Sequence, residues 1–203
     1  MVQCFLIHTV NPVSTLAPGE SRVLYSRVFG PEEGALTGAD SELGPERRRL
    51  LQNEKVAVVA RQVRSAVTQS REASGRVLVE AVLGEELVAL QEADSGVQRL
   101  GKGEPWAGER SALWLGVQSL AFTLVTEPHE NLLLAEGTLK SLTRHCLEYL
   151  RMLGTGSEVR DVLLKSDRID VLLHRLLPHG QLLFLNHRFT QSLEKELANY
   201  MAQ

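Results

Sequence analysis

The chain has 203 residues, a formal net charge of -3 and a sequence isoelectric point near 6.1. Hydrophobic residues make up 43% and charged residues 23%, a balance that excludes a wholly disordered chain and predicts one folded domain over residues 1–203. Acidic residues outnumber basic ones by 25 to 22, whereas a nucleic-acid-binding domain usually carries a clear basic excess. We therefore expect no nucleic acid among its partners.

The cysteines and the hydrophobic segments indicate the compartment. Cys4 and Cys146 form no CxxC pair and are too few for a disulfide framework, so both are predicted to be small core residues. The first ten residues lack the basic start and the long apolar run of a signal peptide. The longest apolar stretch, 112–125, is shorter than the roughly 20 residues that span a bilayer. These features predict a soluble, cytoplasmic protein.

The first third of the chain predicts two strands and a helix. Residues 2–10 are almost entirely apolar, as in a strand buried on both faces. A second strand is predicted at 22–29, where alternation places Leu24 and Tyr25 on opposite faces, and the two strands are expected to pair as a hairpin. After a loop rich in glycine, a helix is predicted to begin at Pro45. Its core-facing stripe is predicted to consist of Leu51, Val56, Val59, Val63 and Val67.

The middle of the chain carries weaker patterns. Residues 72–95 are interpreted as a loop or insertion, in which 76–83 is compatible with a strand and 84–94 with either a helix or a loop. A short strand is predicted near 97–100. The segment GKGEPWAG at 101–108 contains too much glycine and proline for a regular element.

Two apolar strands and a long helix are predicted next. The strands occupy 112–117 and 119–125, and a tight turn or bend is required near Gly116–Gln118. The helix is predicted at 131–153, because apolar residues recur there every three or four positions. Its buried stripe is predicted to be Leu132, Ala135, Leu139, Leu142, Cys146, Leu150 and Leu153.

Further helices are predicted toward the end of the chain. Asp167 is predicted to cap one of them, and Pro178 and Gly180 to end it. Its apolar stripe is predicted to be Ile169, Leu172, Leu173, Leu176 and Leu177. A last helix is predicted to bury Phe189, Leu193, Leu197 and Tyr200 on one side. The type of a short apolar element at 159–164 stays open.

The order of these elements predicts the fold class. Two strands can form a hairpin, three later strands can form a meander, and the helix between them can cross the sheet. The sequence therefore predicts an α/β (α+β) sandwich built on a largely antiparallel sheet.

The motifs that would carry chemistry are incomplete. GVQRLGK at 96–102 matches the start of a phosphate-binding loop, but Gly103 stands where a Ser or Thr would bind magnesium, and no helix pattern follows. His129 and Glu130 begin a zinc-protease motif, yet Leu133 occupies the position of its second histidine. We predict no catalytic, cofactor-binding or metal-ligating residues, and therefore no enzyme.

The distribution of leucine points to a partner protein. Leu132, Leu133 and Leu134 are consecutive, and residues 182–185 are all apolar. Consecutive apolar residues on a helix cannot all face one core, so a second layer or a partner chain must cover some of them. The pattern favours an interaction subunit over a free-standing enzyme.

Five segments carry a resemblance to a known family. They are FLIHT near the start, RVLYSRVFG at 22–30, LWLGVQSLAF at 113–122, HENLLLAE at 129–136 and LLPHGQLLFLN at 176–186. Through them the chain resembles the small (sigma) subunits of the adaptor-protein complexes of vesicle traffic, and most closely those of the fifth such complex. The resemblance spans nearly the whole chain and fades at 31–45 and 72–111.

The resemblance implies a longin-like fold, in which a five-stranded antiparallel sheet is sandwiched by helices. It also implies a structural, non-enzymatic subunit of a heterotetramer with large zeta and beta chains and a medium mu chain, packed on the helical solenoid of the zeta chain. It further implies endosomal and lysosomal protein transport, peripheral association with late endosome and lysosome membranes through the complex, and spatacsin and spastizin as partners. It assigns no cofactor, cargo or interface residue.

Two other interpretations stay open. The first is another longin-type regulator of membrane traffic, which normally continues into a heptad helix and an anchor, whereas this chain ends at Gln203 without either. The second is a small hydrolase, which would require a pocket lined by histidine and carboxylate side chains.

Overall fold

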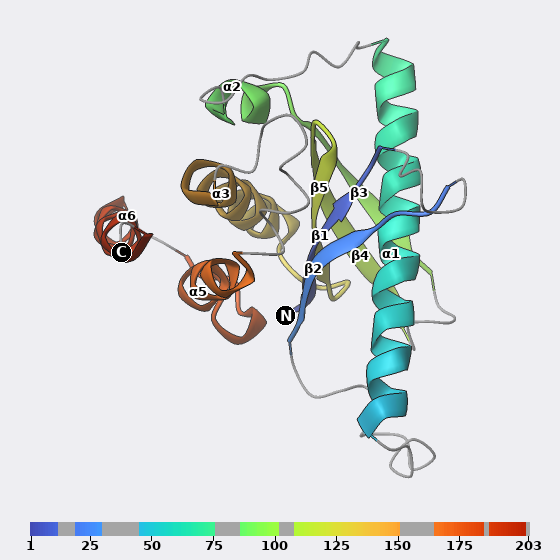
Figure 1. Cartoon of the computed structure of the whole chain (residues 1–203), viewed down its shortest axis with the longest axis horizontal. Helices are drawn as coiled ribbons and strands as arrows, with labels where there is room; N and C mark the ends of the chain where they lie inside the picture. Colours follow the sequence, from blue (N-terminus) through green and yellow to red (C-terminus); the bar gives the residue numbers. More distant parts are fainter. Residues whose placement is uncertain are drawn as a thin grey trace.

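The computed structural model of the chain describes residues 1–11, 19–29, 45–75, 86–101, 108–150, 165–184 and 187–201. The strands are β1 (Val2–Thr9), β2 (Val23–Val28), β3 (Asp94–Leu100), β4 (Arg110–Val117) and β5 (Leu120–Thr126). The helices are α1 (Pro45–Ser74), α2 (Glu86–Gln91), α3 (Leu132–Leu150), α5 (Ser166–Leu176), the short 3-10 helix η2 (Pro178–Gly180) and α6 (His187–Met201). Figure 1 shows α1 along one face of the sheet and α3 and α5 on the other, with α6 outside them.

The strands form one five-stranded antiparallel sheet in the order β2-β1-β5-β4-β3. β1 and β2 form the predicted hairpin, and β3, β4 and β5 form the predicted meander. The tight turn between β4 and β5 contains Gln118, which has a positive φ of 53°. The predicted sandwich of helices on an antiparallel sheet is therefore confirmed.

The inner strand β1 separates two hydrophobic layers. All eight of its residues are buried, as predicted. Because side chains alternate along a strand, Phe5 and Ile7 belong to the core beneath α3 and α5, while Cys4 and Leu6 belong to the core beneath α1. The sheet is thus covered on both faces, which explains why the sequence of β1 lacks a polar side.

The predicted stripe of α1 is confirmed except at its start. Val56, Val59, Val63 and Val67 are at most 3% exposed, but Leu51 is 41% exposed. A helix of 30 residues is about 45 Å long, whereas an eight-residue strand spans about 27 Å. The first turns of α1 therefore extend beyond the sheet, as Figure 1 shows, and the prediction that Leu51 is buried was wrong.

A β-bulge changes the predicted faces of β2. His8 pairs with Val23 and Ile7 pairs with Tyr25, so Leu24 is an extra residue between two consecutive pairs. Leu24 and Tyr25 consequently lie in the same core layer, although alternation placed them on opposite faces. The prediction failed because a bulge interrupts the period of two.

The region predicted as a loop or insertion at 72–95 contains regular structure in its described part. α1 continues to Ser74, α2 occupies Glu86–Gln91, and β3 begins at Asp94, three residues before the predicted strand. The expected strand at 76–83, the glycine-rich loop at 30–44 and the element at 159–164 lie outside the described residues.

The C-terminal helices largely follow the predicted pattern. All five residues of the stripe on and after α5 are buried: Ile169, Leu172, Leu173, Leu176 and Leu177. Asp167 lies inside the first turn of α5, and Lys165 occupies the N-cap without a capping hydrogen bond from its side chain, so the predicted cap was wrong. On α6, Leu193 and Leu197 are buried, whereas Phe189 and Tyr200 are about half exposed.

A buried histidine should make stability depend on pH. His8 is fully buried in β1, where Nδ1 lies 2.9 Å from Ser21 Oγ and Nε2 lies 3.3 Å from Thr123 Oγ1. Burial lowers its pKa from 6.5 to about 4. Between these two values the unfolded chain binds more protons than the folded one, so the stability contributed by neutral His8 is complete above about pH 6.5 and is lost as the pH falls toward about 4.

Urea unfolding between pH 4 and pH 7.5 tests this expectation. The His8→Gln variant should show a shallower decrease of unfolding free energy on acidification than the parent chain. The matched control is His129→Gln, which changes an exposed histidine and should keep the parent's slope. Equal slopes for the parent and both variants would contradict the role of His8.

Candidate interaction surface

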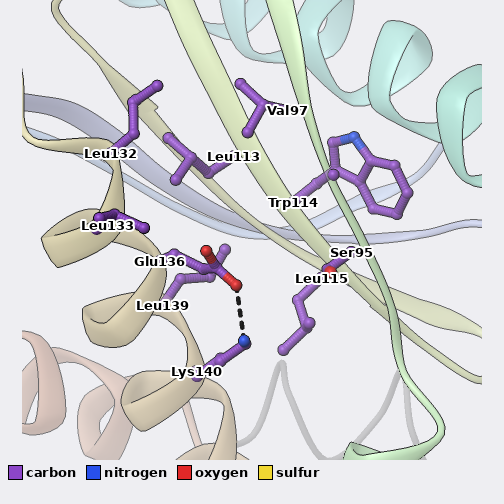
Figure 2. A pocket seen from close by; sticks show the side chains of 11 residues that line it. Ser95, Val97, Leu113, Trp114, Leu115, Leu132, Leu133, Glu136, Leu139 and Lys140 are labelled. Atoms are coloured by element: carbon purple, nitrogen blue, oxygen red, sulfur yellow. Dashed lines mark ion pairs between the residues drawn. The ribbon is translucent and has the colours of Figure 1, made fainter.

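An apolar groove lies beside the β3 edge of the sheet, on the face that α3 covers. It has a volume of about 140 Å³, with β3 and β4 on one side and the N-terminal half of α3 on the other. Its apolar lining consists of Val97, Leu113, Leu115, Leu132, Leu133 and Leu139. Figure 2 shows the leucines of α3 facing Val97 and Leu113 across this groove.

The position of α3 leaves the groove open. α3 packs on β4 and β5, and Val97 on the same face of β3 is 52% exposed. Leu113 and Leu115 point to the α3 face, and Trp114 between them belongs to the layer beneath α1. In Figure 2 the indole of Trp114 accordingly points away from the groove.

Gly96 supports this arrangement and does not belong to a phosphate-binding loop. It pairs with Trp114 inside the β3–β4 ladder, where its backbone is extended. A Cβ atom at Gly96 would lie 2.5 Å from Cζ2 of Trp114. The glycine therefore leaves room for the indole ring, and residues 96–100 of the incomplete loop motif belong to β3.

The first turn of α3 presents leucines to solvent. Asn131 caps the helix, since its Oδ1 accepts a hydrogen bond of 3.1 Å from the backbone N–H of Leu134. Leu133 is 81% exposed and Leu132 is 38% exposed. Leu132 was predicted to be buried, which was wrong because it lies at the open groove. The rest of the described stripe is buried: Ala135, Leu139, Leu142, Cys146 and Leu150.

Charged side chains border the groove. Lys140 Nζ and Glu136 Oε1 form an ion pair of 2.6 Å on α3, and both side chains are about half exposed. Arg99 is exposed on β3, two residues beyond Val97 and on the same face of the strand. Glu136 and Lys140 neutralise each other, and Arg99 places a positive charge next to Val97, just outside the residues that line the groove.

The cysteine thiols and the possible metal ligands do not form a reactive site in the described residues. Burial raises the pKa of the Cys4 and Cys146 thiols to about 12, in agreement with their predicted role in the core. Across the described ranges, no group of three or more His, Cys, Asp or Glu side chains could hold a metal ion. Among the helices described, none combines the length and hydrophobicity needed to cross a membrane.

The groove was not assigned from the sequence. The run Leu132–Leu134 indicated that not all of these leucines face one core, and Leu133 is indeed 81% exposed, whereas Leu132 had been predicted to be buried. Val97 carried no such signal, because its exposure depends on β3 being an outer strand of the sheet. Phe184, in the predicted apolar run 182–185, is also exposed, at 84%.

Comparisons with known proteins identify close relatives. The profile of the family described as AP-5 complex subunit sigma-1 matches residues 1–198. A Homo sapiens protein named AP-5 complex subunit sigma-1 is 48% identical over 200 residues, covering 98% of both chains. Its Mus musculus namesake is 43% identical over 155 residues, covering 75% of this chain and 90% of the mouse chain. Among solved structures, a chain of a homology model of the full-length AP-3 complex in a stretched open conformation is similar, with a TM-score of 0.49, 12% identity and coverage of 100% and 96%.

Proposed function

Because this chain belongs to the AP-5 complex subunit sigma-1 family, we propose that it acts as the small subunit of a heterotetrameric adaptor complex in vesicle-mediated protein transport. It is a structural component of this complex and catalyses no reaction. Its partners are the large zeta and beta chains and the medium mu chain, together with spatacsin and spastizin. The complex associates peripherally with late endosome and lysosome membranes. Family membership supports each of these assignments.

The observation that favours a scaffolding mechanism is the exposed apolar surface at the groove. Permanent interfaces between subunits usually bury more than about 2,000 Å² and resemble a protein core. Val97, Leu132 and Leu133 provide the beginning of such a surface, and the buried face of α3 holds two of them in place. We assign this surface to contact with the large zeta chain.

Affinity purification of the tagged, full-length chain from cells tests the proposal. Identification of the co-purifying proteins should recover two large chains and one medium chain in equal amounts. Recovery of the chain alone, or in a stoichiometric complex of a different kind, would refute the proposed function.

A charge placed in the groove should weaken this assembly. Leu133→Asp is expected to reduce recovery of the large chains at least tenfold, because an interface cannot bury an unpaired carboxylate without a large cost. The fold should persist, since Leu133 is 81% exposed. The measurement is the amount of co-purified large chain, alongside the melting temperature of the variant.

The matched control is Leu50→Asp, because Leu50 is 63% exposed on α1, which packs on the opposite face of the sheet. It should leave recovery unchanged. If Leu50→Asp disrupts the assembly and Leu133→Asp does not, the partner covers the α1 face and the assignment of the groove is wrong.

A further inference from the structure

The outer edge of β3 is suited to accept another strand. β3 pairs with β4 over seven consecutive residues without a register shift, and it has no second neighbour within the described part of the chain. Proteins commonly protect such edges with charged side chains, proline or a bulge. Asp94–Leu100 contains no proline and no bulge, and of its two charged residues Asp94 pairs with Arg71, which leaves Arg99 as the exposed charge on this strand. A regular edge of this kind presents its backbone N–H and C=O groups to an incoming strand.

The groove beside this edge has the size of one side chain. A cavity of about 150 Å³ lined by Leu, Ile and Phe binds a single benzene molecule, and the groove measures about 140 Å³. Side chains on one face of a strand recur about every 6.8 Å. A strand added along β3 could therefore place one large apolar side chain between Val97 and Leu133.

The positive charge of Arg99, next to Val97, indicates which type of residue would follow the apolar one on the same face of an added strand. Glu136 and Lys140 pair with each other at 2.6 Å, whereas Arg99 is exposed two residues beyond Val97. A side chain two positions from the apolar one would lie opposite Arg99. A carboxylate complements a guanidinium at this position better than any other side chain.

We propose that β3 and the adjoining groove form a strand-addition site for an extended segment of the large zeta chain. This segment hydrogen-bonds to the outer edge of β3, places a large apolar side chain between Val97 and Leu133, and directs an acidic side chain two residues away to Arg99. The inference rests on the proposed function, because that function supplies the large chain as the partner.

Binding of a synthetic peptide to the full-length chain tests this geometry. The probe is a fluorescein-labelled peptide in which aspartate stands two residues from leucine. It is made as Thr-Thr-Thr-Leu-Thr-Asp-Thr-Thr-Thr for a strand parallel to β3 and as Thr-Thr-Thr-Asp-Thr-Leu-Thr-Thr-Thr for an antiparallel one, and binding is followed by fluorescence anisotropy. Replacing its leucine with alanine should weaken binding at least tenfold. In the protein, Val97→Asp should have the same effect, and Arg99→Glu should weaken this peptide but favour one that carries lysine in place of the aspartate.

Backbone methylation separates strand addition from ordinary apolar contact. Only alternate amides of an added strand point toward β3, so N-methylation of one alternating set should abolish binding while methylation of the other set should preserve it. Equal binding of the two methylated peptides, or no binding of the unmodified probe, would overturn the inference. If only this inference is wrong, the peptide fails to bind as described but the large chains still co-purify with the tagged chain. If the proposed function is wrong, the large chains do not co-purify.

Discussion

Replacing Gly180 with alanine is expected to lower the free energy of unfolding by about 2–5 kcal/mol, from left-handed backbone strain and overpacking together. Gly180 ends η2 with a positive φ of 77°. A Cβ atom there would lie 2.5 Å from the backbone oxygen of Val2 and 2.7 Å from Cβ of Phe29. The backbone of β1 cannot move away without disturbing its pairing with both β2 and β5.

Substitutions at two other glycines separate backbone strain from overpacking as causes of the destabilisation expected at Gly180. Gly75 also has a positive φ, of 62°, but a Cβ there meets no atom within 4 Å, so Gly75→Ala should cost only the strain of about 1–2 kcal/mol. Gly137 lies inside α3 with open space around it, so Gly137→Ala should stabilise the protein by about 0.5–1 kcal/mol. Urea unfolding of the three variants gives the comparison. A cost at Gly180 no larger than that at Gly75 would show that the close packing against β1 is unimportant.

Replacing Arg71 with methionine is expected to destabilise the protein by about 3–5 kcal/mol, because it removes the guanidinium that pairs with a buried carboxylate. Arg71 Nε donates to Asp94 Oδ2 at 3.0 Å, and Arg71 Nη2 donates to the backbone oxygen of Gln118 at 2.7 Å. The two side chains are only 12% and 9% exposed. The guanidinium therefore joins α1 to the start of β3 and to the β4–β5 turn.

A double substitution and a control at an exposed ion pair test whether the effect of Arg71 depends on the burial of its ion pair with Asp94. Replacing both Arg71 and Asp94 with apolar residues should recover much of the loss, because the buried carboxylate that had lost Arg71 is then absent as well. Arg27 and Asp170 form an exposed pair at 3.5 Å, so Arg27→Met should cost less than about 1 kcal/mol. The free energies come from chemical unfolding. Equal losses for Arg71→Met and Arg27→Met would contradict the importance of the buried pair.

The groove could be predicted only in part. The leucine run at 132–134 indicated an apolar surface on this helix, because a helix covering one core cannot bury three consecutive residues. The other side of the groove depends on Val97 lying on an outer strand. Strand order is a long-range property, and the pattern of residues 97–100 is compatible with either an outer or an inner strand.

The amino-acid sequence by itself determined the elements whose burial follows a local period. The unbroken apolar run of β1 and the valine stripe of α1 required a sheet covered on both faces, because these apolar side chains would otherwise be exposed to water. Family membership was also contained in the sequence. Tertiary structure decided that Leu51 lies beyond the sheet, that Leu24 forms a bulge, and that Val97 and Leu133 border an open groove. These outcomes depend on the lengths, pairing and order of elements distant in the chain, which no local pattern records.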